Sequence, residues 1–192
     1  MFKGLLIGIL LGVILVGICV YFYFSTGSAP AATTDSPMPF EKRLARMTLN
    51  AHIEKQKVGE PPVPTDEKNY LSGVEVYKKN CAVCHGLPGE RSFLAEGMYP
   101  KPPQLFQGVG VTDDPASETY WKAENGIRLT GMPGFKGRLT ETEIWQVSLL
   151  LANADKVPDS VKAALKAPAP PQAAAPGDAA ATATSKAAPT KK

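Results

Sequence analysis

Cys81, Cys84 and His85 form the sequence C-x-x-C-H, and their types and spacing suit one particular chemistry. Two thiols three positions apart can each add to one vinyl group of the same porphyrin, which gives two thioether bonds. The histidine directly after Cys84 is then placed under the ring, where its imidazole can bind iron as the proximal ligand. The motif therefore predicts a covalent haem that is attached through Cys81 and Cys84 and ligated by His85.

Two other interpretations of this pentapeptide are weaker. A structural zinc site needs four ligands, usually with a second pair downstream. The remaining cysteine is Cys19, inside an apolar run, and the remaining histidine is His52. A dithiol redox motif would sit between a strand and a helix, and no alternating strand pattern precedes Cys81. Haem attachment is therefore the favoured prediction.

A second axial ligand is expected downstream, in a loop on the other face of the haem. Met132 is a thioether donor within the sequence Gly-Met-Pro-Gly. The glycines let the backbone approach the ring closely, and the proline stiffens the loop. Met98 lies in another Gly/Pro-rich loop but follows His85 closely, and His52 lies in a predicted helix before the motif. We therefore expect Met132, rather than Met98 or His52, to be the sixth ligand.

In these residues the sequence resembles the class I monohaem cytochrome c family, over about half of the chain from Thr65 to Ala154. Besides the attachment motif, the resemblance is carried by Tyr99–Leu105, Asn125–Gly126 and Gly131–Pro133. It implies an all-α domain around one covalent haem c, with His85 and Met132 as axial ligands of the iron. It also implies that Gly73 and Tyr77 pack against an aromatic residue of the last helix, here Trp145.

The function implied by this resemblance is one-electron transfer, in which no small-molecule substrate is transformed. The expected partners are an electron-donor and an electron-acceptor redox protein, and the chain is not expected to be an enzyme. His/Met ligation implies a fairly high potential. Two alternatives stay open: a haem enzyme or gas sensor with an open sixth position, and a fixed subunit of a larger respiratory or dehydrogenase complex.

An uninterrupted apolar run without any charge covers residues 4–24, after Lys3. As a helix it would be about 31 Å long, which is enough to cross a bilayer. A cleaved signal peptide is the alternative, but its apolar core is usually only about 7–15 residues. We therefore expect residues 1–24 to be an uncleaved anchor in the cytoplasmic membrane. The resemblance, which extends to membrane-anchored bacterial cytochromes c, implies a haem domain on the periplasmic face.

Composition divides the rest of the chain into further segments. Residues 25–38 are small and polar and predict a flexible tether. Residues 39–58 predict a basic amphipathic helix that begins at Pro39. Its apolar stripe could lie on anionic headgroups or pack on the haem domain or a partner. The haem domain is expected over residues 65–156, and an Ala/Pro-rich disordered tail over residues 157–192.

Local signals place helices within the haem domain. Thr65 or Asp66 can cap a helix that runs to about residue 80. A loop is expected over residues 86–110, and a second helix over residues 114–125. Residues 140–143 read as a capping box that opens a last helix to about residue 153.

The charge distribution gives no support for nucleic-acid binding. Residues 66–156 contain ten Lys/Arg and twelve Asp/Glu residues, although the whole chain has a net charge of +3. The basic excess therefore lies in the helix before the domain and in the tail, not on an element that could read a groove. The acidic balance of the domain favours partners with a basic docking patch.

Overall fold

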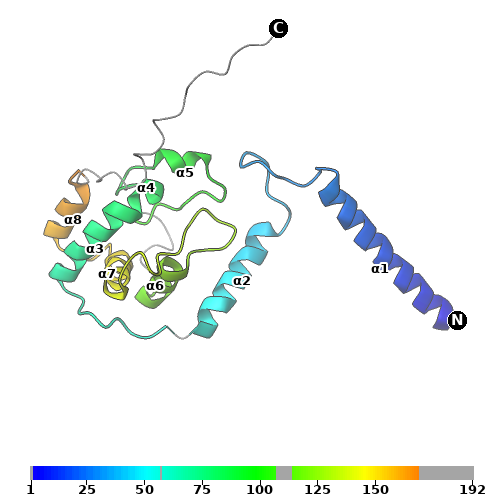
Figure 1. Ribbon diagram of the computed structural model, residues 1–192, viewed down its shortest axis with the longest axis horizontal. Helices are drawn as coiled ribbons and strands as arrows, with labels where there is room; N and C mark the ends of the chain where they lie inside the picture. Colours follow the sequence, from blue (N-terminus) through cyan, green and yellow to red (C-terminus); the bar gives the residue numbers. More distant parts are fainter. Residues whose placement is uncertain (1, 57, 107–113, 169–192) are drawn as a thin grey trace, which may run out of the picture.

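The computed structural model describes residues 2–56, 58–106 and 114–168. These residues form helices and loops and contain no β-strand, only an isolated bridge between Lys136 and Leu139. The predicted all-α fold is therefore confirmed (Figure 1). The helices are α1 (Phe2–Ser25), α2 (Glu41–Gln56), α3 (Glu67–Asn80), α4 (Ala82–His85), α5 (Phe93–Gly97), α6 (Ala116–Asn125), α7 (Glu141–Ala152) and α8 (Asp159–Lys166).

The main core lies between α3 and α7. Tyr77, Val74 and Leu150 are fully buried there, because both helices turn apolar stripes toward each other. Gly73 lets the two helices approach closely, since a Cβ at this position would collide with the backbone carbonyl of Gln146. The domain thus rests on one tight contact between two helices far apart in the sequence.

Gly73 was expected to pack with Tyr77 against Trp145, and this was wrong for the residue, although the contact is with the predicted helix, α7. Gly73 meets α7 at Gln146, one position further along. The Trp145 ring instead stacks on Tyr120 of α6, with ring centroids 4.2 Å apart. Successive helical residues point about 100° apart, so Trp145 faces a different neighbour from Gln146.

A second, smaller cluster joins α6 to α7. It consists of Tyr120, Ala123, Ile144 and Trp145. Val58 and Val63, which lie between α2 and α3, pack against it. The stretch between α2 and α3 is therefore attached to the domain at its apolar positions.

Of the three helix starts predicted in the domain, those of α3 and α7 are confirmed by side-chain caps, whereas α6 begins at Ala116 after Pro115 without a side-chain cap. The Asp66 side chain accepts a hydrogen bond of 2.9 Å from the backbone N–H of Asn69. At the start of α7, the Thr140 hydroxyl accepts from the N–H of Glu143, and the Glu143 carboxylate accepts from the N–H of Thr140. Each cap satisfies backbone donors that a helix leaves unpaired at its first turn.

The predicted tail, residues 157–192, was wrong at its beginning, because α8 belongs to the folded domain. Val161 and Leu165 are buried against the main core, one helical turn apart. The Lys78 ammonium of α3 donates hydrogen bonds to two carbonyls at the end of α8, those of Ala164 and Ala167. Residues 169–192 lie outside the described part of the chain, so disorder there stays a prediction.

Two further segments differ from expectation in detail. The region 86–110 contains the short helix α5, which the Ser92 side chain caps at its start. The basic helix α2 begins at Glu41, two residues after Pro39, because Phe40 has a left-handed backbone (φ 63°). The Glu41 carboxylate accepts a hydrogen bond from the N–H of Met38 and so closes the first turn.

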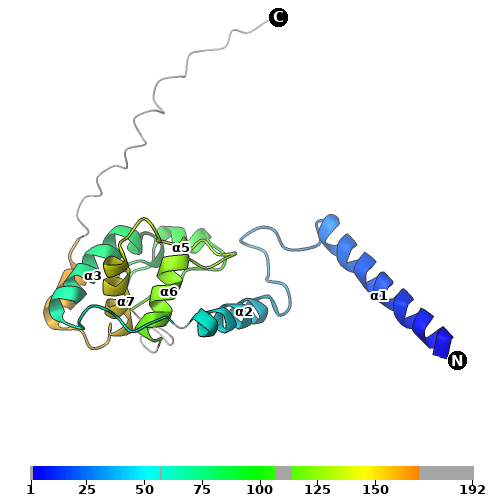
Figure 2. The ribbon, with the colours of Figure 1, turned by 60° about the horizontal axis from the view of Figure 1, so that its bottom comes forward.

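Helix α1 extends away from the domain and buries none of its residues (Figures 1 and 2). Among the described residues it is the helix that is long and apolar enough to cross a membrane, a property that a signal sequence shares. The segment after it contains a turn, in which the Asp35 carboxylate accepts from the N–H groups of Ala31 and Ala32, both at 2.8 Å. Together with Glu41 and Tyr99, this segment lines a shallow hollow.

Candidate functional site

The end of α3 brings the two cysteines and the histidine of the motif onto one turn. Cys81 closes α3, with its N–H donating to the carbonyl of Tyr77 at 2.8 Å. The chain then continues as α4, where the N–H groups of Cys84 and His85 both donate to the Cys81 carbonyl, at 3.1 and 2.9 Å. The spacing predicted from the sequence is therefore realised as a single helical turn.

The two thiols differ in their surroundings. Cys81 packs against the main core, and this burial, followed by the neighbouring Cys84, raises the pKa of its thiol to about 12. Cys84 is half-buried, and both residues are free thiols. Each is thus available to form its own thioether bond.

The imidazole of His85 is oriented by a backbone carbonyl from another segment. Its Nδ1 lies 2.7 Å from the carbonyl oxygen of Pro103, which can only accept, so Nδ1 carries the proton. Burial lowers the pKa of His85, and the Pro103 carbonyl acts in the opposite direction. The favoured form is a neutral imidazole with a free Nε2 lone pair, which is the form that ligates metals.

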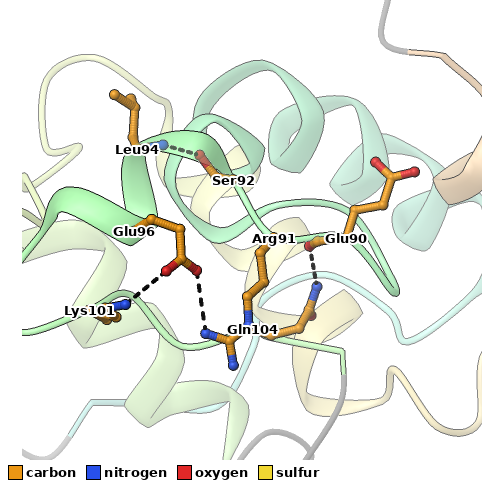
Figure 3. A network of polar contacts seen from close by, with 7 residues as sticks. All are labelled: Glu90, Arg91, Ser92, Leu94, Glu96, Lys101 and Gln104. Carbon is orange, nitrogen blue, oxygen red and sulfur yellow. Dashed lines mark hydrogen bonds and ion pairs between the residues drawn. The ribbon is translucent and has the colours of Figure 1, made fainter.

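Gln104 holds the segment that carries Pro103 in place. Its Nε2 donates to the carbonyl of Leu87 at 2.6 Å and to the carbonyl of Glu90 at 3.2 Å. Figure 3 shows the second of these bonds. The Oε1 of Gln104 accepts from the N–H of Phe106 at 2.6 Å. The loop after α4 is thereby tied to the extended stretch that orients His85, and the sequence carried no signal for this role of Gln104.

Charged side chains surround this loop at the surface. Glu96 of α5 forms ion pairs with Lys101 at 2.8 Å and with Arg91 at 3.8 Å (Figure 3). The hydrogen bond from Lys101 is the main cause that lowers the pKa of Glu96. These groups are exposed, so water screens their attraction and the pairs fix loop geometry more than they add stability.

Tyr77 is a site residue that sequence reasoning assigned only to packing. Its hydroxyl donates a 2.7 Å hydrogen bond to the carbonyl of Gly86, the residue directly after His85. Its ring meets Phe106 edge to face, with centroids 4.8 Å apart. Burial raises the pKa of Tyr77, so the phenol stays a donor. The main core is thus hydrogen-bonded directly to the end of the motif.

The loop that carries Met132 closes tightly on the end of α6. Ile127 donates to the carbonyl of Met132 at 3.2 Å, and Met132 donates to the hydroxyl of Thr130 at 3.1 Å. Gly126 has a left-handed backbone (φ 72°), and a Cβ there would lie 2.5 Å from the nitrogen of Gly134. Glycine is therefore needed at position 126, where two stretches of backbone come into contact.

The two other candidates for the sixth ligand lie in different places. The methyl group of Met98 lies against Gly131, where it occupies the space that a side chain at 131 would need. The structure therefore brings Met98 to the loop of Met132. His52 instead contacts Trp121 of α6, with ring centroids 5.4 Å apart.

The donors of the site fit a c-type haem. They comprise two thiols on one turn, an imidazole with its Nε2 free, and thioether sulfurs in a glycine-rich loop. Leu87, Leu105 and Phe106, like Cys81, are partly buried and pack against the main core. In the described ranges no group of three or more His, Cys, Asp or Glu side chains is placed to hold a bare metal ion.

Comparison with known proteins identifies similarity over the part of the chain that contains these residues. Residues 68–149 match the family model described as cytochrome c oxidase, cbb3-type, subunit III. The chain is also 36% identical over 84 residues to the cytochrome c subunit of alcohol dehydrogenase (quinone) from Gluconobacter oxydans (strain 621H). That alignment covers 40% of this chain and 16% of the relative. No solved structure matches the chain significantly.

Proposed function

We propose that this chain is a membrane-anchored carrier of single electrons that holds one covalent haem, because residues 68–149 match a cytochrome c family model. The observation that carries the proposal is the histidine directly after two thiols on one turn, with its Nδ1 bonded to Pro103. This geometry leaves one nitrogen for iron and two sulfurs for the porphyrin edge.

Each residue of the site has a separate task in this proposal. Cys81 and Cys84 would hold the haem covalently, and His85 and Met132 would ligate its iron. When bound, the haem supplies an iron that alternates between the ferric and ferrous states. The hydrogen bond from His85 to Pro103 fixes the ring orientation and raises the basicity of the ligating nitrogen. A methionine ligand favours the ferrous state and so a high potential.

The cytochrome c domain indicates an electron carrier rather than a catalytic enzyme. The relative named above is a subunit of a quinone-dependent dehydrogenase. We therefore propose that the chain exchanges electrons with a donor and an acceptor redox protein, as a mobile carrier or as a subunit of a membrane complex. Helix α1 anchors it in the cytoplasmic membrane, with the haem domain on the periplasmic face.

Covalent attachment is tested on the full chain, matured in a host that attaches c-type haem. We expect haem to stay with the denatured polypeptide after acid-acetone extraction. Cys81→Ala and Cys84→Ala should each retain haem through one thioether, and the double variant should release it. Free extraction from the unaltered chain would refute the proposed attachment.

Ligation is tested with two methionine variants. Met132→Ala should remove the weak far-red charge-transfer band of the oxidised protein and allow carbon monoxide to bind. Met98→Ala should retain the band if Met98 only packs against the loop at Gly131. The opposite pattern would assign the ligand to Met98. Binding of carbon monoxide by the unaltered protein would instead support an enzyme or gas sensor with an open position.

A further inference from the structure

The segment 92–103 is hydrogen-bonded to the haem-attachment turn at both of its ends. The Ser92 hydroxyl donates to the carbonyl of Val83, which lies between the two cysteines of the motif. At the other end, the Pro103 carbonyl accepts from Nδ1 of His85 at 2.7 Å. The residues between these two bonds are therefore held next to the proximal side of the candidate site.

The middle of this segment is ordered by its own polar contacts. Helix α5 starts at a side-chain cap, in which the N–H of Leu94 donates to the Ser92 hydroxyl at 3.1 Å (Figure 3). Glu96 of α5 forms an ion pair with Lys101 at 2.8 Å, which Figure 3 also shows. Met98 lies between these two charged residues in the sequence, so the ion pair closes the short loop that carries it.

Met98 reaches from this segment to the loop of the predicted second ligand. It is half-buried, and its methyl carbon occupies the position that a Cβ at Gly131 would take. Its sulfur lies 3.7 Å from the same position. Because Gly131 directly precedes Met132, the Met98 side chain covers the backbone from which the predicted iron ligand projects.

The other contacts of the Met132 loop come from the loop itself and from α6. The Thr130 hydroxyl accepts from the N–H of Met132 at 3.1 Å, within the loop. The N–H of Phe135 donates to the carbonyl of Ala123 at 2.9 Å and so ties the end of the loop to α6. Met98 adds a contact from a separate segment, directly beside the ligand.

We propose that Met98 is a positioning residue for Met132: it packs on the loop at Gly131 and so favours the form in which Met132 is bound to iron. The inference rests on the haem ligation proposed above. When the loop opens, the sixth position of the iron becomes available, and the apparent affinity for an added ligand rises with the open fraction. Met98 keeps this fraction small without touching the iron itself.

The test measures imidazole binding to the oxidised, haem-loaded full chain in detergent, followed by loss of the far-red band. Met98→Ala should retain the band without imidazole. It should lower the apparent Kd for imidazole about five- to tenfold, the order expected when a half-buried side chain loses three heavy atoms. Met98→Leu keeps the volume but has no thioether, so it should bind imidazole as the unaltered chain does. Met47→Ala removes the same atoms from an exposed position on α2 and should leave the Kd unchanged.

The outcomes separate this inference from the proposed ligation. An unchanged Kd in Met98→Ala would refute the positioning role and leave ligation by Met132 intact. Loss of the band in Met98→Leu would make Met98 the ligand itself and would overturn both. If the unaltered chain has no band and binds imidazole as tightly as Met132→Ala, the ligation by Met132 is wrong and the positioning role is refuted with it.

The contact itself is tested from the side of Gly131, whose backbone is not left-handed, so that alanine is tolerated there. Gly131→Ala should push the Met98 methyl group away and lower the Kd for imidazole. The effect should be smaller than that of Met98→Ala, because a flexible thioether can swing aside. In the Met98→Ala background Gly131→Ala should have no further effect, since both changes remove one contact. Equal effects in the two backgrounds would refute this contact as the source.

Discussion

Substitutions at three glycines can measure how much the close backbone contact of the Met132 loop contributes to stability. Gly126 combines a left-handed backbone (φ 72°) with a close backbone contact. Gly137 has the same kind of backbone (φ 80°), but a Cβ there would meet nothing within 4 Å. Gly134 has only the contact, because a Cβ there would lie 2.8 Å from the backbone of Asn125. Alanine at each position therefore separates the cost of conformation from the cost of collision.

The expected magnitudes follow from these geometries. Gly137→Ala should cost about 1–2 kcal/mol for placing an L-residue in the left-handed region. Gly126→Ala should cost about 1–3 kcal/mol more, since overpacking of that size forces the backbone to shift. For a domain of this size each kcal/mol lowers Tm by about 4–8 °C. Gly134→Ala should lower the free energy of unfolding by about the difference between the effects of Gly126→Ala and Gly137→Ala. The reason is that alanine at position 134 causes the collision without the left-handed backbone.

The assay is thermal unfolding of the detergent-solubilised haem protein, with the far-red band as a second readout. Gly126→Ala and Gly134→Ala should also weaken the band, because their collisions displace the backbone beside Met132. Gly137→Ala should leave the band intact. The reasoning is refuted if Tm falls by the same amount in all three variants, or if Gly137→Ala is the only variant that disturbs the band. In either case the loop contact does not position the ligand.

Three further variants probe the support around the site. Tyr77→Phe should destabilise the protein by about 1–3 kcal/mol in denaturant unfolding, because the buried Gly86 carbonyl loses its 2.7 Å partner. Lys78→Met should cost about 1–3 kcal/mol, since two carbonyls at the end of α8 lose a charged donor, with faster hydrogen exchange confined to α8. The pKa of Glu143 is lowered mainly by the N–H of Thr140, so this carboxylate stabilises α7 above its ordinary pKa of 4.5. The stability difference between the unaltered chain and Glu143→Gln should therefore shrink as pH falls through 4.5 and below.

Each of these expectations has a contrary outcome. An unchanged denaturation midpoint in Tyr77→Phe would mean that water replaces the phenol without cost. Protection lost throughout α3 and α7 in Lys78→Met would show a general core defect instead of a local one. A stability difference for Glu143→Gln that is constant from pH 7 to pH 3 would exclude the carboxylate as its source.

Signals that lie within one helical turn were sufficient to predict much of this fold. The Asp66 cap and the capping box at Thr140 and Glu143 each involve residues three apart, and the structure contains both. The C-x-x-C-H motif is equally local, and its three reactive side chains fall on one turn. Such patterns depend only on residues a few positions apart, so they can be predicted from the spacing of residues in the sequence.

Features that depend on distant segments were missed. The bond from His85 to Pro103 joins residues 18 positions apart, and nothing in the sequence announces it. Helix α8 has only Val161 and Leu165 to bury, so its pattern resembles the Ala-rich stretch that follows. Its stability comes from the surface of α3, including Lys78, and not from its own propensity.

Helix α8 also changes where the smallest independent unit of this chain ends. The family match stops at residue 149, but the apolar core closes only with Val157, Val161 and Leu165. A shortened chain ending at residue 156 would uncover the face of α3 beneath α8 and leave the Lys78 ammonium without its carbonyl acceptors. The segment that the family model matches and the folded domain therefore end at different residues, and the folded domain extends at least to Ala167.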